Sequence, residues 1–326
     1  PHVKGLAVTY PVLLGKIANW HVCKGGSHRL AHALMRVIVK AGGRVFPQVP
    51  VTQIVVEGGR AVGVMTPDGF VRAHKLVASS IDVNQTFETL LEPQFVPERT
   101  RREVADVKYQ DATLFNVHVA MNGLPRYKAA AFDPDIDRAW ILNIGFESLA
   151  DFEHEFAEAR AGRLPKRPRL NAAVNSLYDP TDAPEGKATG LLRVFAPFAL
   201  EDGGAEAWGR VSRQYGEACL ARWRAVMIDD DARSIVRRFS TESPHEISQK
   251  MINYRFGDWM VGRIHPKNLL EHRPTDELAG YRTPISGLYL CGASQHPHGY
   301  ITFAPGYNAL GVIAEDMGID KWWDRV

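Results

Sequence analysis

The sequence is short of several features that mark whole classes of protein. Its three cysteines, Cys23, Cys219 and Cys291, lie far apart, and so few thiols cannot form a disulfide framework. No run of about 18 apolar residues occurs, so no transmembrane helix is expected. The 39 basic residues barely exceed the 37 acidic ones, which gives no reason to expect nucleic acid as a partner. We therefore expect a globular protein of a reducing compartment, the cytoplasm or the mitochondrial matrix.

Glycine-based phosphate loops are missing as well. None of the 28 glycines stands two residues from another, so the Gly-x-Gly-x-x-Gly fingerprint of dinucleotide-binding units is absent, and no Gly-x-x-x-x-Gly-Lys loop replaces it. The sequence starts at Pro1 without a signal-like segment, which predicts a processed, truncated or partly observed chain. With 45% hydrophobic and 23% charged residues, the composition is that of a globular protein with one large or two ordinary cores.

Local patterns predict alternating helices and strands. The pair Gly58-Gly59 separates two β-branched stretches, which is typical of a hairpin. Asp82 follows an apolar strand and predicts the N-cap of a helix that ends near Leu91. Strands are expected at 44–46, 51–57, 61–66, 75–79, 113–121, 139–145, 170–177 and 191–198, and helices at 27–41, 206–227 and 245–251.

The most informative segment lies near the carboxyl end. An apolar strand at 288–291 stops at Gly292, a loop rich in glycine and proline follows, and a helix begins at about Gly306. In open α/β sheets a ligand lies across the carboxyl ends of the strands, where glycine lets the backbone approach it and a helix start offers free N–H groups. This arrangement predicts a nucleotide or flavin site.

The residues of this segment carry a resemblance to a known family. Leu-Tyr-Leu-Cys-Gly-Ala-Ser at 288–294, His-Pro at 296–297 and Ala-Pro-Gly-x-Asn-Ala at 304–309 resemble the C-terminal flavin motif of the phytoene-desaturase-like family, the carotenoid and retinoid oxidoreductases. The connector at 179–187 and the Arg-Pro pair at 273–274 are similar to further stretches of that family, in the same order.

This resemblance implies an α/β fold: the C-terminal portion of an FAD/NAD(P)-binding, two-dinucleotide-type flavoprotein, with an inserted substrate domain of mixed sheet and helices. The implied division is a substrate-domain segment at 1–24, an FAD-domain segment with a β-meander at 25–92, the substrate domain at 93–265, and a C-terminal FAD-domain segment at 266–326.

The resemblance also implies an activity. We expect an FAD-dependent oxidoreductase of the desaturase, saturase or isomerase type that acts on an apolar, isoprenoid-like small molecule. Because the glycine fingerprint is absent, FAD would be shared with an N-terminal fragment or partner chain that carries it, in an oligomer, and this chain alone would be inactive or flavin-free. Peripheral contact with a membrane is left open. The alternative is a flavin-free or split-chain subunit with a binding or scaffolding role.

Individual residues can be assigned to the expected site. His296, His298 and Tyr300 are candidates for proton transfer, since histidine titrates near neutral pH and tyrosine can donate a hydrogen bond. His298 and Tyr300 stand where the family usually has glycine, so they shape a substrate pocket, fill the flavin space or pack within their own loop. The candidate cofactor-binding residues are Val51, Ser79, Gly292, Ala293, Pro305, Gly306 and Asn308.

Two other kinds of site are weighed and set aside. Gly292-Ala-Ser294 after a strand is similar to a nucleophile elbow, but that turn needs a small residue two positions after the serine, and His296 stands there. His28 and His32 have the spacing of metal ligands on one helix face, yet no third ligand is evident. We therefore expect neither a hydrolase nor a metal site.

Overall fold

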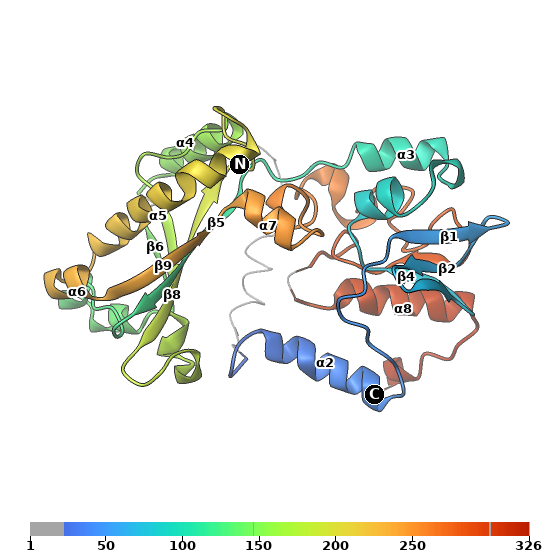
Figure 1. The fold of residues 1–326 in the computed structure, drawn as a ribbon, viewed down its shortest axis with the longest axis horizontal. Coiled ribbons are helices and arrows are strands. Elements are labelled where there is room, and N and C mark those ends of the chain that lie inside the picture. Colours follow the sequence, from blue (N-terminus) through green and yellow to red (C-terminus); the bar gives the residue numbers. More distant parts are fainter. Residues whose placement is uncertain (1–22, 146, 300, 326) are drawn as a thin grey trace. The chain divides into compact units, whose positions relative to one another are not determined.

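The computed structural model describes residues 23–145, 147–299 and 301–325, so Tyr300 lies outside the described residues. The contacts divide the chain into two compact units, drawn in Figure 1. The first comprises Pro1–Val45 and Asp111–Lys250, and the second comprises Phe46–Gln110 and Met251–Val326. Compactness does not show which unit holds a cofactor, so the four domain segments inferred from the sequence stay predictions.

The first unit is built on a five-stranded sheet in the order β6-β7-β8-β5-β9. Every pairing in it is antiparallel, where the sequence predicts a mixed sheet. The strands are β5 (Thr113–Met121), β6 (Ile141–Ile144), β7 (Leu170–Ala173), β8 (Ala188–Ala196) and β9 (Val236–Glu242).

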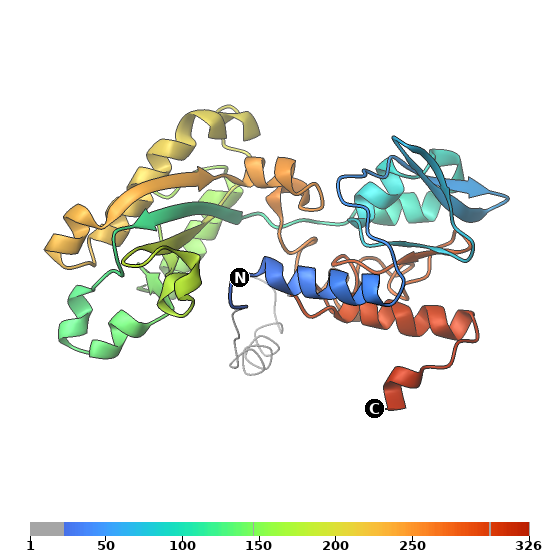
Figure 2. The same cartoon turned by 60° about the horizontal axis from the view of Figure 1, so that its bottom comes forward.

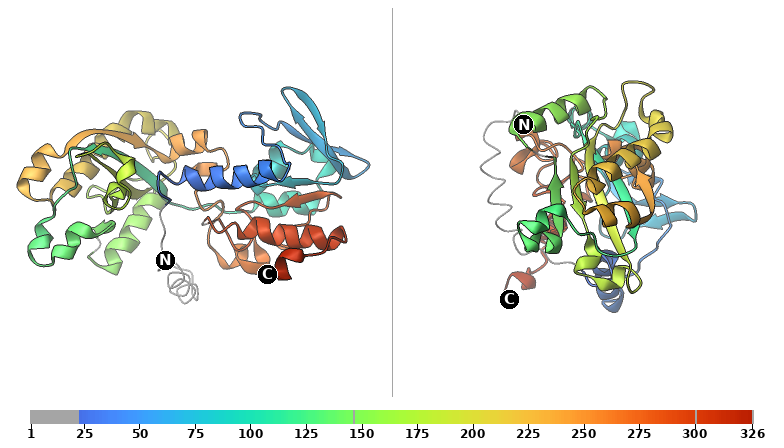
Figure 3. Two further views of the ribbon diagram at one scale, coloured as in Figure 1. Left: turned by 90° about the horizontal axis from the view of Figure 1, so that it is seen from below. Right: turned by 90° about the vertical axis from the view of Figure 1, so that its left-hand side faces the viewer.

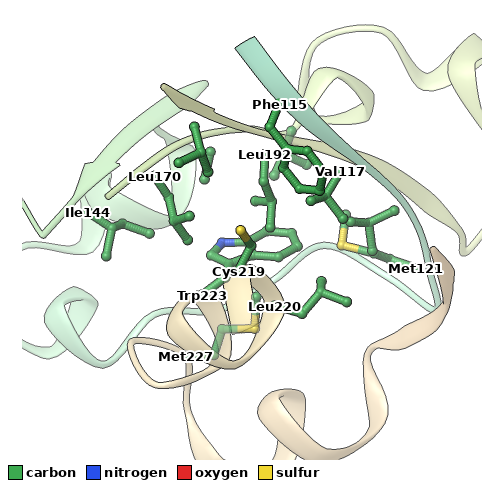
Figure 4. Packing of buried hydrophobic residues seen from close by; sticks show 14 of the residues in the cluster. Phe115, Val117, Met121, Ile144, Leu170, Leu192, Cys219, Leu220, Trp223 and Met227 are labelled. Carbon is green, nitrogen blue, oxygen red and sulfur yellow. The ribbon is translucent and has the colours of Figure 1, made fainter. Parts of the chain in front are cut away.

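Helix α5 (Trp208–Arg224) covers one face of this sheet (Figure 3). The core between them includes Phe115, Leu192 and Trp223, which Figure 4 shows packed together. Gly216 allows the close approach, because a Cβ there would lie 2.5 Å from the Cγ2 of Thr241 on β9. Among the described residues, the other α-helices of this unit are α2 (His28–Lys40), α4 (Leu149–Arg160), α6 (Asp229–Ser234) and α7 (Pro244–Lys250).

The second unit begins with the expected meander, the blue strands of Figure 2. Its strands β1 (Gln53–Glu57), β2 (Arg60–Thr66) and β3 (Gly69–Arg72) pair antiparallel. Gly58 and Gly59 have φ of +56° and +78°, the left-handed values that the tight hairpin turn requires. No strand forms at 44–46, and β3 was not expected, because four residues are too few to show an alternation.

A two-stranded parallel sheet follows, made of β4 (Val77–Ser79) and β10 (Leu288–Leu290). Helix α8 (Ala304–Asp316) packs against β10, and α3 (Glu98–Ala105) completes the unit. Leu278, Leu288 and Leu290 are buried in its apolar core. Among the helices in the described ranges, none combines the length and apolarity needed to cross a membrane.

The predicted cap at Asp82 is confirmed. Its Oδ1 accepts hydrogen bonds from the backbone N–H groups of Asn84 (3.1 Å) and Gln85 (3.2 Å), at the start of a short helix that widens into a π turn over Gln85–Thr89. The Tyr109 hydroxyl donates to the other carboxylate oxygen at 2.8 Å. Burial nevertheless raises the pKa of the Asp82 carboxyl above its ordinary value.

Candidate functional site

The candidate site lies at the carboxyl ends of β4 and β10. Leu290 pairs with Ser79, and the N–H of Cys291 donates to the Ser79 carbonyl at 2.9 Å, which is the last bond of the parallel ladder. Both strands therefore end at the same edge, and Gly292 comes directly after it. This is the position at which open parallel sheets bind their ligands.

Gly292 is required by the packing of the chain itself. A Cβ at this position would lie 2.3 Å from the carbonyl oxygen of Ser80 and 2.7 Å from its carbonyl carbon. Both atoms belong to the backbone and cannot rotate away. The glycine at the end of β10 is thus explained by the close approach of the segment after β4, without a ligand.

The loop after Gly292 is tied to its surroundings by hydrogen bonds. The Ala293 carbonyl accepts from Nη2 of Arg273 at 2.9 Å, and the Ser294 hydroxyl oxygen accepts from the Val83 N–H at 3.1 Å. Ser294 is buried, so its hydroxyl is not presented to a substrate as a nucleophile elbow demands. The hydrolase interpretation therefore receives no support from the geometry.

Arg273 holds this loop from within the unit. Its side chain is fully buried, and Nη2 also donates to the carbonyls of Met260 (3.2 Å) and Val261 (2.9 Å). A guanidinium is well suited to such a position because it carries several donors in a fixed plane. Arg273 joins the 260–261 segment to the loop that follows the last strand.

The two histidines of the loop occupy different environments. His298 is 3% exposed, its Nδ1 accepts from the Gly299 N–H at 3.1 Å, and burial, together with the Arg273 cation and His296, lowers its pKa to about 3. His296 is half-buried, and burial also lowers its pKa from the ordinary value. Both rings are therefore neutral at neutral pH. His296 is the more accessible of the two for proton transfer, and both assignments stay predictions.

Asn308 and Tyr281 connect the loop to the helix behind it. The Tyr281 hydroxyl donates to the His296 carbonyl at 2.7 Å and accepts from Nδ2 of Asn308 at 2.8 Å. Asn308 lies in the second turn of α8, and Tyr281 is buried. The amide of Asn308 thus positions the loop, while its proposed contact with a cofactor remains untested.

The start of α8 offers a backbone surface to a ligand. Pro305 lies in the first turn and is buried, whereas Gly306 is exposed and no described residue accepts a hydrogen bond from its N–H. A Cβ on Gly306 would come no closer than 4.0 Å to the nearest atom, the Cys291 carbonyl oxygen. Packing therefore does not require glycine here, in contrast to Gly292. A helix start with a free N–H and a positive dipole end suits an electron-rich ligand.

The two other candidate cofactor residues have less distinctive positions. The Ser79 hydroxyl is buried and hydrogen-bonded to the Thr86 hydroxyl at 2.9 Å. Val51 is half-buried and lies two residues before β1. Metal ligation receives no support, since the described residues hold no cluster of three His, Cys, Asp or Glu side chains, and His28 and His32 stack edge to face with ring centroids 5.2 Å apart.

Sequence reasoning missed the parts played by Arg273 and Tyr281. Each forms its bonds with residues distant in the chain, so no local spacing shows them. The available signal was the Arg-Pro pair and the tyrosine that precedes the last strand, both within stretches that resemble the family.

The chain is similar to known flavin-containing enzymes over most of its length. A model of flavin-containing amine oxidoreductases matches residues 6–306. A limonene dehydrogenase subunit of Castellaniella defragrans is 31% identical over 326 residues, which covers 96% of this chain and 58% of that protein. The neurosporene-forming phytoene desaturase of Cereibacter sphaeroides is 27% identical over 289 residues, 85% of this chain and 50% of the relative. The chain thus spans about half the length of these curated relatives.

Solved structures support the fold. The crystal structure of an oxidoreductase from Methanosarcina mazei is similar with a TM-score of 0.52 and 17% identity, over 90% of this chain and 55% of that one. A redesigned putrescine oxidase has the same TM-score, 0.52, at 14% identity. The family and the α/β flavoprotein fold that the C-terminal motif predicts are confirmed.

Proposed function

Because this chain belongs to the flavin-containing amine oxidoreductase family, we propose that it forms the substrate unit and one wall of the flavin site in an FAD-dependent oxidoreductase. The proposed reaction is the desaturation, saturation or isomerisation of an apolar, isoprenoid-like molecule. Support for this substrate class comes from the names of two relatives, a limonene dehydrogenase and a phytoene desaturase.

The observation that carries the proposal is the difference between the two glycines of the site. Gly292 is fixed by contact with the Ser80 backbone, but Gly306 is exposed and has room for a side chain. A glycine that the fold does not require, at an open helix start beside the carboxyl ends of parallel strands, is well explained by a ligand that approaches the backbone.

FAD, when bound, would accept or donate the hydride, and the protein would contribute orientation and electrostatics. The Gly306 N–H and the dipole of α8 would stabilise negative charge on the ring edge that faces them. Tyr281 and Asn308 would hold the loop at a fixed distance from that edge through their hydrogen bonds. His296, neutral at neutral pH, would be able to accept a proton there.

A second segment is needed to complete the site. The described residues contain no Gly-x-Gly-x-x-Gly loop for the pyrophosphate. Among the described strands β4 pairs only with β10, so the other edge of β4 is free. The side chains of Phe303, Tyr307 and Leu310, at the start of α8, are 45–55% exposed. We propose that a unit carrying the glycine fingerprint, from the same polypeptide or a partner, covers the free edge of β4 and this face of α8. The limonene dehydrogenase relative is itself named as one subunit of its enzyme, which supports an assembly of chains.

Flavin content tests the proposal. The natural protein that carries this chain should be yellow after purification, and flavin released by denaturation should match the protein in amount. Gly306→Ala should weaken flavin binding at least tenfold, because a methyl group intrudes where the backbone meets the ring. The matched control Gly311→Ala lies on the same helix, where a Cβ would meet only Nζ of Lys321 at 3.6 Å.

The two outcomes separate the flavin enzyme from the alternative. Loss of flavin in the Gly306 variant without loss of stability, together with unchanged flavin in the Gly311 variant, supports the proposed site. A natural protein that is colourless and gains no colour on incubation with FAD contradicts it and favours a binding or scaffolding role.

A further inference from the structure

A strongly basic pocket lies in the first unit, between helix α5 and the start of β9. It is open to solvent and has a volume of about 400 Å³. Two arginines from the helix and two from the strand line it, together with two apolar residues. The lining residues are Arg213, Arg224, Val236, Arg237, Arg238 and Phe239. None of them belongs to the flavin site described above.

The positive charge in this pocket is poorly balanced. Arg213 pairs with Glu217 at 3.4 Å, but both side chains are largely exposed, so the pair holds the guanidinium only weakly. Arg224, Arg237 and Arg238 form no ion pair with any described residue, and the Nε of Arg224 is buried without a hydrogen-bond partner. Three of the four guanidinium groups that line the pocket are therefore left without a carboxylate partner among the described residues.

A break in strand pairing contributes to the pocket. Ala120 pairs with Arg238 and Met121 pairs with Val236, so Arg237 is an extra residue without a partner on β5. Such bulges re-aim side chains and are common at sheet edges and beside functional sites. Here the bulge gathers two arginines at the edge strand, which has no neighbour on its other side among the described strands.

The wall of the pocket is partly apolar and aromatic. The Cζ atom of Arg213 lies 5.3 Å from the ring centroid of Phe239, within the range of a cation–π contact. Phe239 and Val236 also pack against the core of the unit, so the strand side of the pocket is anchored. The pocket therefore combines a fixed wall with guanidinium groups that lack acceptors.

We propose that this pocket is a binding site for a phosphate-bearing ligand. A carboxylate has two oxygens and one charge, which a single guanidinium satisfies. A phosphate group carries close to two charges and three acceptor oxygens, so it can serve several arginines at once. The bidentate fork of arginine matches this geometry. The phosphate can belong to a soluble molecule or to a lipid headgroup, and Arg224, Arg237 and Arg238 would recognise either.

Calorimetric titration with inorganic diphosphate tests the site in the full chain. Arg224→Gln should weaken binding at least tenfold and Arg224→Gln with Arg237→Gln about a hundredfold, in keeping with the strength of charge-assisted hydrogen bonds. The matched control is Arg160→Gln, because Arg160 is exposed and is the last residue of α4 as Arg224 is of α5. Both single variants lose the same charge at a helix end, but only one lies in the pocket.

A second arm distinguishes the source of the phosphate. Vesicles of phosphatidylcholine, with and without phosphatidic acid, are sedimented with the wild-type protein and the same variants. Diphosphate binding without sedimentation identifies a soluble ligand, and sedimentation with phosphatidic acid that Arg224→Gln abolishes identifies a lipid headgroup. The proposal is overturned if neither probe binds, or if Arg160→Gln weakens binding as much as Arg224→Gln.

Discussion

Replacement of Gly292 by alanine tests the packing of the candidate site most sharply. The new Cβ would stand 2.3 Å from the Ser80 carbonyl oxygen, whereas even weak C–H···O contacts keep carbon and oxygen at about 3.3–3.6 Å. The two backbone segments must therefore separate by about 1 Å. We expect this to strain the hydrogen bond between the Cys291 N–H and the Ser79 carbonyl, which closes the parallel ladder.

The expected loss of stability combines two effects. Overpacking of a tight contact costs about 1–3 kcal/mol, and a weakened backbone hydrogen bond costs about 1 kcal/mol more. Gly292→Ala should thus destabilise the second unit by about 2–4 kcal/mol. The control Gly311→Ala, with an ordinary contact of 3.6 Å, should gain up to about 1 kcal/mol from the better helix propensity of alanine.

Urea unfolding and amide hydrogen exchange measure this effect. The Cys291 amide should exchange much faster in Gly292→Ala than in the wild-type protein, and the urea midpoint should fall. If the variant unfolds within about 0.5 kcal/mol of wild type and the amide stays protected, the close approach to Ser80 does not explain this glycine. Any loss of flavin in the variant would then have to come from contact with the cofactor.

Two further predictions concern the loop. Tyr281→Phe should lower the free energy of unfolding by about 1–2 kcal/mol and speed hydrogen exchange in the loop, because it removes a buried hydroxyl that joins two segments. The control Tyr289→Phe should change little, because the hydroxyl of Tyr289 forms an exposed hydrogen bond. Equal effects of the two substitutions would contradict the linking role of Tyr281. His298 has a pKa of about 3 against an ordinary 6.5, so the folded state binds fewer protons between these values and its stability rises with pH across that window. The rise amounts to at most about 1.4 kcal/mol in the free energy of unfolding per pH unit. His298→Asn should remove this contribution, which urea unfolding at several pH values would measure. The exposed control His74→Asn should keep the slope, and an unchanged slope in His298→Asn would show that the buried ring does not set it.

Much of the fold was predictable because local patterns determine it. The hairpin at Gly58-Gly59, the cap at Asp82 and the long strand at 113–121 each follow from residues close together in sequence, and all are present. The edge strand β9 was missed because its polar residues resemble those of a loop. Helix α4 was missed because charged residues interrupt its apolar face.

The candidate site was predictable only in part. The strand, the turn at Gly292 and the helix near Gly306 were expected from a short segment whose order resembles a family. The reason that position 292 must be glycine was not predictable, because its neighbour Ser80 lies more than 200 residues away in the sequence. The same holds for Arg273, whose bonds join segments that only the fold brings together.

The most direct test of the account is the flavin affinity of the natural protein that carries this chain, compared between wild type, Gly306→Ala and Gly311→Ala. The apoprotein is titrated with FAD, and the quenching of flavin fluorescence gives the affinity while urea unfolding reports stability. We predict binding in the wild type, at least tenfold weaker binding in Gly306→Ala, no change in Gly311→Ala, and no loss of stability in either. Equal affinities in the three proteins would contradict the placement of the flavin at the start of α8.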